Sequence, residues 1–151
     1  MDIKKELNKL FPNLPSNYSF KSLTKEESLL FNCIAYTIDS YDKWIWVNEK
    51  DWTWQNVPRI LSVNNFKTLY NFYGYEECHS FLYEANYDKI VVYSIQDIPR
   101  HACKQHGDIW KSKIGEMPII LIHELSWLVN NNIKDRYAYG DIAFVMKKRI
   151  N

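Results

Sequence analysis

The chain has 151 residues, of which 46% are hydrophobic and 25% charged, and its formal net charge is +1. This length suits one domain with a sizeable core, so we expect residues 1–151 to form a single domain. The composition excludes a disordered chain, and the near-neutral charge argues against nucleic acid as a partner, because phosphate binding needs clustered Lys and Arg.

Cysteine usage and the N-terminal sequence bear on the cellular compartment. Cys33, Cys78 and Cys103 are odd in number and irregularly spaced, which favours reduced thiols over a disulfide framework. Asp2 lies where a signal peptide would be basic, and no segment approaches the roughly 20 apolar residues of a membrane span. We therefore expect a cytoplasmic protein with no membrane partner.

The first third of the chain is predicted to be mainly helical. Apolar residues at helical spacing predict a helix over 2–10. Thr24 and Glu27 form a capping-box pattern, and the helical signal begins again at Asn32. The Trp-rich stretch 44–54 is expected to be extended or a loop that covers the core.

The remaining two thirds are predicted to be mainly strands. Residues 62–73 have the most regular helical spacing, and Gly74 is a typical helix stop. Short β-branched runs predict strands. The predicted elements are a helix over 62–73, strands over 89–94, 100–106, 108–113 and 141–147, and a short helix over 121–129.

Cys33 is the candidate nucleophile. A cysteine attacks as its thiolate, and a helix N-terminus favours that form because unpaired backbone N–H groups face it. Those N–H groups, with the amide of Asn32 or Cys33, are candidate oxyanion donors. Asn32 is also the candidate N-cap of the same helix.

His101 is the candidate general base. If His106 and Gly107 form a two-residue hairpin loop, the register pairs His101 with Ser112 on one face of the sheet. A hydroxyl there would fix the imidazole tautomer, as the third member of a catalytic triad does. A slip of one residue would move Ser112 to the other face.

The order of these elements resembles the papain-like fold, in the group that includes the NlpC/P60 and CHAP amidohydrolases. Asn32-Cys33 at a helix start, a strand over 88–93, and a hairpin from His101 to Ser112 carry the resemblance, which spans roughly residues 30–115. It implies an α+β fold with a papain-like (NlpC/P60-like) core, in which helices pack on a small antiparallel sheet. It also implies a cysteine peptidase or amidase with a peptide or amide substrate.

The chain also resembles a bacterial domain family of unknown function. That family carries the patterns Asn-Cys-x-Ala, His-Ala and Trp-x-Ser-Lys-x-Gly, which are matched here by residues 32–35, 101–102 and 110–115. This resemblance is closer than the first, but it implies no activity.

Structural roles compete with catalysis. A single helical cysteine is most often a small buried hydrophobic residue, which is the structural alternative for Cys33. His101 also fits a strand histidine with its hydrogen bonds satisfied, and Ser112 fits an ordinary exposed hydroxyl. The alternative from another class is a non-catalytic interaction module, which would bind a protein partner through the aromatic surface of residues 44–54.

A metal site is an alternative to the dyad of Cys33 and His101. Soft ligands occur at Cys78, His79, His101, Cys103 and His106, but their spacing matches no standard zinc motif. Phosphate-binding Gly loops, Gly-x-Ser-x-Gly elbows and paired-carboxylate motifs are absent from the sequence. We therefore expect neither a metal nor a cofactor.

Overall fold

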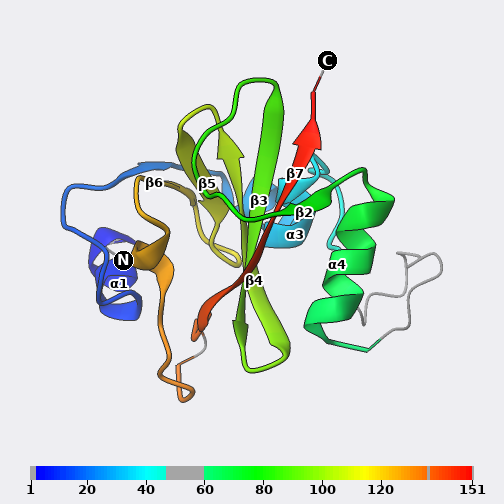
Figure 1. Cartoon of the computed structure of the whole chain (residues 1–151). Coiled ribbons are helices and arrows are strands. Elements are labelled where there is room, and N and C mark those ends of the chain that lie inside the picture. Colours follow the sequence, from blue (N-terminus) through cyan, green and yellow to red (C-terminus); the bar gives the residue numbers. More distant parts are fainter. Residues whose placement is uncertain (1–2, 47–59, 136, 151) are drawn as a thin grey trace.

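The computed structural model describes residues 3–46, 60–135 and 137–150. Its centre is a seven-stranded antiparallel sheet with the strand order β1-β6-β5-β4-β3-β7-β2 (Figure 1). The strands are β1 (Ser19–Lys21), β2 (Glu76–Cys78), β3 (Tyr87–Ile95), β4 (Ile98–His106), β5 (Ile109–Lys113), β6 (Ile119–Ile122) and β7 (Asp141–Arg149).

The helices are short. They are α1 (Ile3–Leu10), α2 (Lys25–Leu30), α3 (Cys33–Thr37), α4 (Val63–Phe72) and the 3-10 helix η1 (Leu125–Leu128). The predicted capping box is confirmed, because the Thr24 hydroxyl accepts from the Glu27 N–H and the Glu27 carboxylate accepts from the Thr24 N–H. The helices predicted near residues 2–10 and 62–73 are also confirmed.

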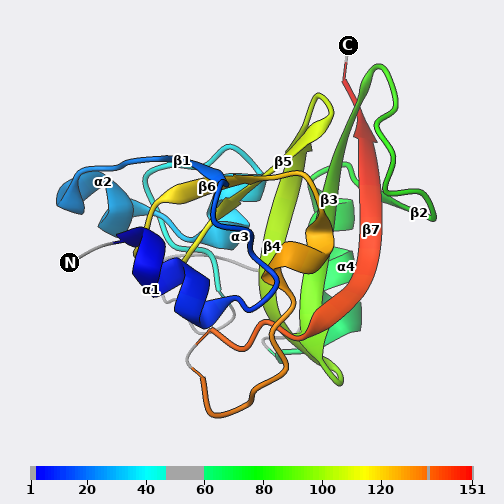
Figure 2. The same ribbon diagram turned by 90° about the vertical axis from the view of Figure 1, so that its left-hand side faces the viewer.

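Both faces of the sheet are covered. Ile90 and Val92 of β3 pack with residues of α3 and α4, whereas Val91 and Tyr93 pack with residues of α1 and η1. Figures 1 and 2 show α1 and α4 on opposite sides of the sheet. Two buried faces explain why this strand reads as a continuous apolar run without alternation.

The predicted α+β, papain-like (NlpC/P60-like) core is wrong. Three strands were missed, namely β1, β2 and β6, and β3, β4 and β7 have nine residues each. The sheet therefore dominates, and helices of five to ten residues only cover it. Strands of three or four residues are too short to show alternation, which is why the sequence did not reveal them.

The helix predicted over 121–129 is also wrong. Residues Ile119–Ile122 form β6, which pairs with β5 on one side and β1 on the other, and only Leu125–Leu128 is helical, as a single 3-10 turn. A short apolar run fits either a buried strand or a helix segment, so periodicity could not distinguish the two.

The hairpin of β4 and β5 forms as predicted, but in a different register. Gln105 pairs with Trp110 and His106 with Ile109, so Gly107 and Asp108 form the loop. The predicted pairing placed Gln105 opposite Asp108. A difference of two residues keeps every side chain on its predicted face, because strands have a period of two.

Candidate functional site

Asn32 is the N-cap of α3. Its Oδ1 accepts from the Ala35 N–H at 3.1 Å and from the Ile45 N–H at 3.1 Å, and its Nδ2 donates to the Ile45 carbonyl at 2.9 Å. The buried side chain thus starts the helix and also holds the segment after it. Cys33 follows as the first residue of α3 and is 8% exposed.

His101 is fixed from two sides. Its Nε2 shares a hydrogen bond with the Ser112 hydroxyl, and both residues are buried. The imidazole stacks on the Tyr139 ring, with centroids 3.9 Å apart and planes 4° apart. The structure therefore brings Ser112 to His101, as a diagonal neighbour across the hairpin.

Gly140 sets the position of Tyr139. Its φ is +81°, and a Cβ atom there would lie 2.0 Å from the Ser94 carbonyl oxygen, which is far inside contact distance. Only glycine therefore lets this segment approach β3 so closely. The approach places the Tyr139 ring against His101.

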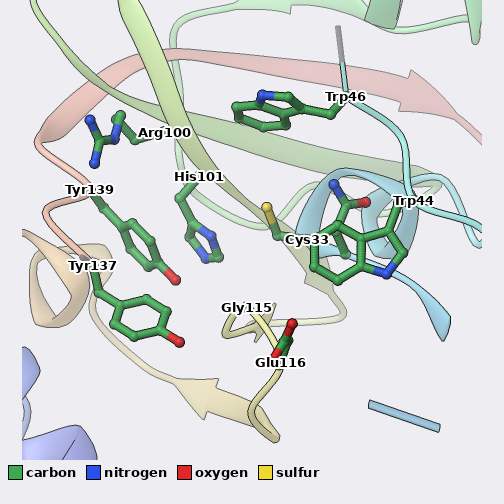
Figure 3. Close-up of a pocket in the computed structure, with 10 residues that line it drawn as sticks. Cys33, Trp44, Trp46, Arg100, His101, Gly115, Glu116, Tyr137 and Tyr139 are labelled. Atoms are coloured by element: carbon green, nitrogen blue, oxygen red, sulfur yellow. The ribbon is translucent and has the colours of Figure 1, made fainter. Parts of the chain in front are cut away.

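One pocket of about 300 Å³ contains both candidate reactive groups. Figure 3 shows the Cys33 sulfur and the His101 ring facing the same space. No hydrogen bond joins them among the interactions of the described residues. The rest of the lining consists of Asn32, Gly115, four aromatic residues and two charged residues. The aromatic residues are Trp44, Trp46, Tyr137 and Tyr139, and the charged residues are Arg100 and Glu116. Ser112 is not one of the lining residues.

Burial keeps the two candidate reactive groups neutral. It raises the pKa of the Cys33 thiol to about 11, although the N–H groups of Ala102 and Ile34 and the Lys113 cation oppose the shift. It also lowers the pKa of His101 to about 3, and Lys113 adds to that shift. Near pH 7 the proton therefore stays on the sulfur, and the imidazole is a neutral acceptor.

Lys113 lies beside the site, outside the pocket lining, and acts on the pKa of Cys33 and His101; the sequence analysis missed it. Its buried ammonium donates to the Ser28 carbonyl at 2.9 Å and to the Gly115 carbonyl, and lies 5.4 Å from the Phe31 ring centroid. Burial lowers its pKa to about 8. The one sequence signal was its place beside Ser112 in the pattern Trp-x-Ser-Lys-x-Gly.

The other two cysteines lie outside the pocket. Cys78 is half-buried on β2 and Cys103 is fully buried on β4, and all three cysteines are free thiols. Among the described residues, no three His, Cys, Asp or Glu side chains form a group that could hold a metal ion. In the same part of the chain, no helix has the length and apolar character to cross a bilayer.

The Trp-rich stretch 44–54 is described only in part. Trp44 donates to the Leu29 carbonyl at 2.7 Å, Trp46 meets the Phe66 ring edge-on, and both line the pocket. Trp52 and Trp54 lie outside the described residues. The interaction surface expected over this stretch therefore stays a prediction.

The family follows from comparison with known proteins. A model described as Domain of unknown function (DUF7689) matches residues 22–147. The chain belongs to this family. Membership in a family of unknown function, expected from the sequence, is thereby confirmed, whereas the likeness to NlpC/P60 and CHAP enzymes gains no support. No curated protein and no solved structure shows a significant match to this DUF7689 chain.

Proposed function

We propose that this protein is a cysteine-dependent acyl-transfer enzyme that hydrolyses an amide or peptide bond, with Cys33 as nucleophile and His101 as base. The observation that carries the proposal is the orientation of His101. Ser112 and Tyr139 fix the imidazole, and the hydrogen bond at Nε2 leaves Nδ1 as its second nitrogen, in a ring that lines the pocket with the Cys33 thiol.

The chemistry proceeds in two steps. Cys33 attacks the acyl carbon, its S–H proton passes to His101 Nδ1 and then to the leaving nitrogen, and the C–N bond breaks to give a thioester and a free amine. Water then attacks the thioester, gives a proton to His101, and releases the carboxylic acid as the thiol reforms. The backbone N–H groups around Cys33 are candidate donors to the oxyanion in both steps.

Because the Cys33 thiol and the His101 imidazole are both neutral before the reaction, charge develops only during the attack. A preformed thiolate and imidazolium would be unfavourable in this buried site, so His101 must remove the proton as the sulfur attacks. The negative charge then passes to the acyl oxygen rather than remaining on sulfur. The site is therefore expected to act by concerted general-base catalysis.

The test is acyl transfer from p-nitrophenyl acetate to the folded full-length chain, followed by acid quenching and peptide mass spectrometry. We expect an acetyl group on Cys33, formed at least about 100-fold faster than in His101→Gln, because general-base catalysis contributes roughly that factor. Ser112→Ala should cause a smaller loss, since it disturbs only the orientation of the ring.

Cys78 supplies the control within the same chain. Cys78→Ser should acylate at the wild-type rate, and Cys33→Ser should lose acylation at residue 33. Acylation of Cys78 alone, or equal rates at Cys33 with and without His101, would rule out the proposed function.

A further inference from the structure

A β-bulge lies directly before His101. Tyr93 of β3 pairs with His101 of β4, but the next pair along is Ser94 with Pro99, so Arg100 is an extra residue without a partner. A second irregularity occurs at the same level, between β3 and β7. Bulges bend a strand and redirect its side chains, and they are common next to functional sites.

The bulge explains why Arg100 and His101 both line the pocket. Neighbouring residues of a regular strand point to opposite faces of the sheet, and at most one of them would face a given cavity. Here both side chains contribute to the same lining. The extra residue thus adds a guanidinium to the space that contains Cys33.

Arg100 has no counter-charge among the described residues. The structure gives it no ion pair or hydrogen bond there, and its side chain is half-buried. The one acidic residue of the described lining, Glu116, lies on the opposite side of the pocket, with Cys33 and His101 between the two (Figure 3). The pocket is therefore electrically asymmetric.

We propose that Arg100 forms a carboxylate-binding subsite of this pocket, so that the preferred ligand is a small N-acylated amino acid or peptide end with a free carboxylate. A guanidinium fork pairs with a carboxylate through two parallel hydrogen bonds. Arg100 is the single cation of the described lining, which suits one negative charge rather than a phosphate dianion.

The rest of the lining selects the body of the ligand. Trp44, Trp46, Tyr137 and Tyr139 present flat apolar surfaces, which suit an aromatic or aliphatic side chain. A volume of about 300 Å³ is at the lower end of small-molecule sites and accommodates about one residue. Cleavage of such a ligand rests on the proposed function, but its binding does not.

Binding is tested on the full-length Cys33→Ser chain by isothermal titration calorimetry. N-acetylphenylalanine is compared with N-acetylphenylalaninamide, which differs mainly in lacking the charge. We expect the acid to bind at least about 10-fold more tightly than the amide, and Arg100→Met to abolish that preference. Arg100→Lys should keep part of it, because the charge remains but the fork is lost.

Glu116→Gln is the matched control and should keep the preference for the acid. A third probe, the α-amide of N-acetylglutamate, distinguishes a side-chain carboxylate from a terminal one; whichever carboxylate binds more tightly identifies the source. Equal affinity for acid and amide, a preference that survives Arg100→Met, or no binding of any probe would overturn the proposal.

The two proposals fail separately. If the acid preference holds but Cys33 is never acylated, the subsite stands and the enzymatic function does not. If Cys33 is acylated but acid and amide bind equally, the function stands and the Arg100 subsite does not.

Discussion

The two ends of strands β3 and β4 bury polar groups in different ways. At the end near the loop between β4 and β5, Lys89 is fully buried and donates to the Ser80 and Leu82 carbonyls at 2.8 and 2.7 Å. It also pairs with Glu84 at 3.2 Å, and Glu84 pairs with Lys147. At the other end, Cys33, His101 and Lys113 have no carboxylate within ion-pair distance among the described residues.

This difference separates a structural end from the end that contains the candidate reactive groups. Around Lys89 the charges are paired, and the polar contacts hold the loop 79–86 in place. In the pocket, the buried thiol and imidazole are neutral, and Lys113 beside it forms no ion pair among the described residues. A bound anion, or a negative charge that develops during acyl transfer, would be stabilised there.

The largest change in the free energy of unfolding is expected at acid pH and comes from His101. Its pKa is about 3 in the folded chain, against 6.5 as the ordinary value, so between these values only the unfolded chain takes up the proton. Stability should therefore fall as pH falls from 6.5 toward 3, by on the order of 4 kcal/mol from this group. Urea unfolding at pH 7, 5 and 4 measures the slope.

His101→Gln is the comparison variant, because its amide nitrogen keeps a donor near Ser112 but does not titrate. Subtracting its slope removes the contribution of carboxylates, which act in the same range. Identical slopes for the two chains would mean that His101 is protonated in the folded state, and the contrast between the two ends would be lost.

The sequence predicted most elements that lie in regular, well-bounded segments. Helix α4 and strand β7 were recognised because their patterns extend over seven residues or more. The edge strands β1 and β2 were not, because three residues carry no period and their pairing partners are distant in sequence. Their addition turned the expected small sheet into the dominant layer.

The site was predictable only where it depends on side-chain face. Ser112 reaches His101 although the register was misjudged by two residues, because that error preserves the face. Arg100 was not foreseen, because a bulge depends on how both neighbouring strands pair. Tyr139 was missed as well, because its position depends on the close approach of Gly140 to β3.

An intermediate effect on stability is expected when each of the two buried lysines is replaced, and its size should differ between them. Lys89→Met removes three polar contacts of a charged group, one of them to a carboxylate, and should cost about 2–3 kcal/mol of unfolding free energy at pH 7. Lys113→Met loses two carbonyl contacts but relieves the burial of an unpaired cation, so it should cost less. Urea unfolding of both variants provides the comparison; an equal or reversed order would contradict it.

The smallest expected effect is the change in stability that Lys113 causes in weak alkali. Its pKa is about 8 in the folded chain, against 10.5 as the ordinary value, so between them only the unfolded chain retains the proton. Stability should therefore rise with pH in this range, by less than about 1.4 kcal/mol between pH 8 and 9.

Lys113→Met should remove this rise, whereas Lys89→Met should keep it. The interval ends at pH 9 because the ordinary pKa of a thiol is 9.0 and that of buried Cys33 is about 11, so above pH 9 the thiol makes stability fall with pH. A rise that persists in Lys113→Met would place its source elsewhere. In that case Lys113 would be as well compensated as Lys89, and the end that contains the candidate reactive groups would hold no spare positive charge for a developing oxyanion.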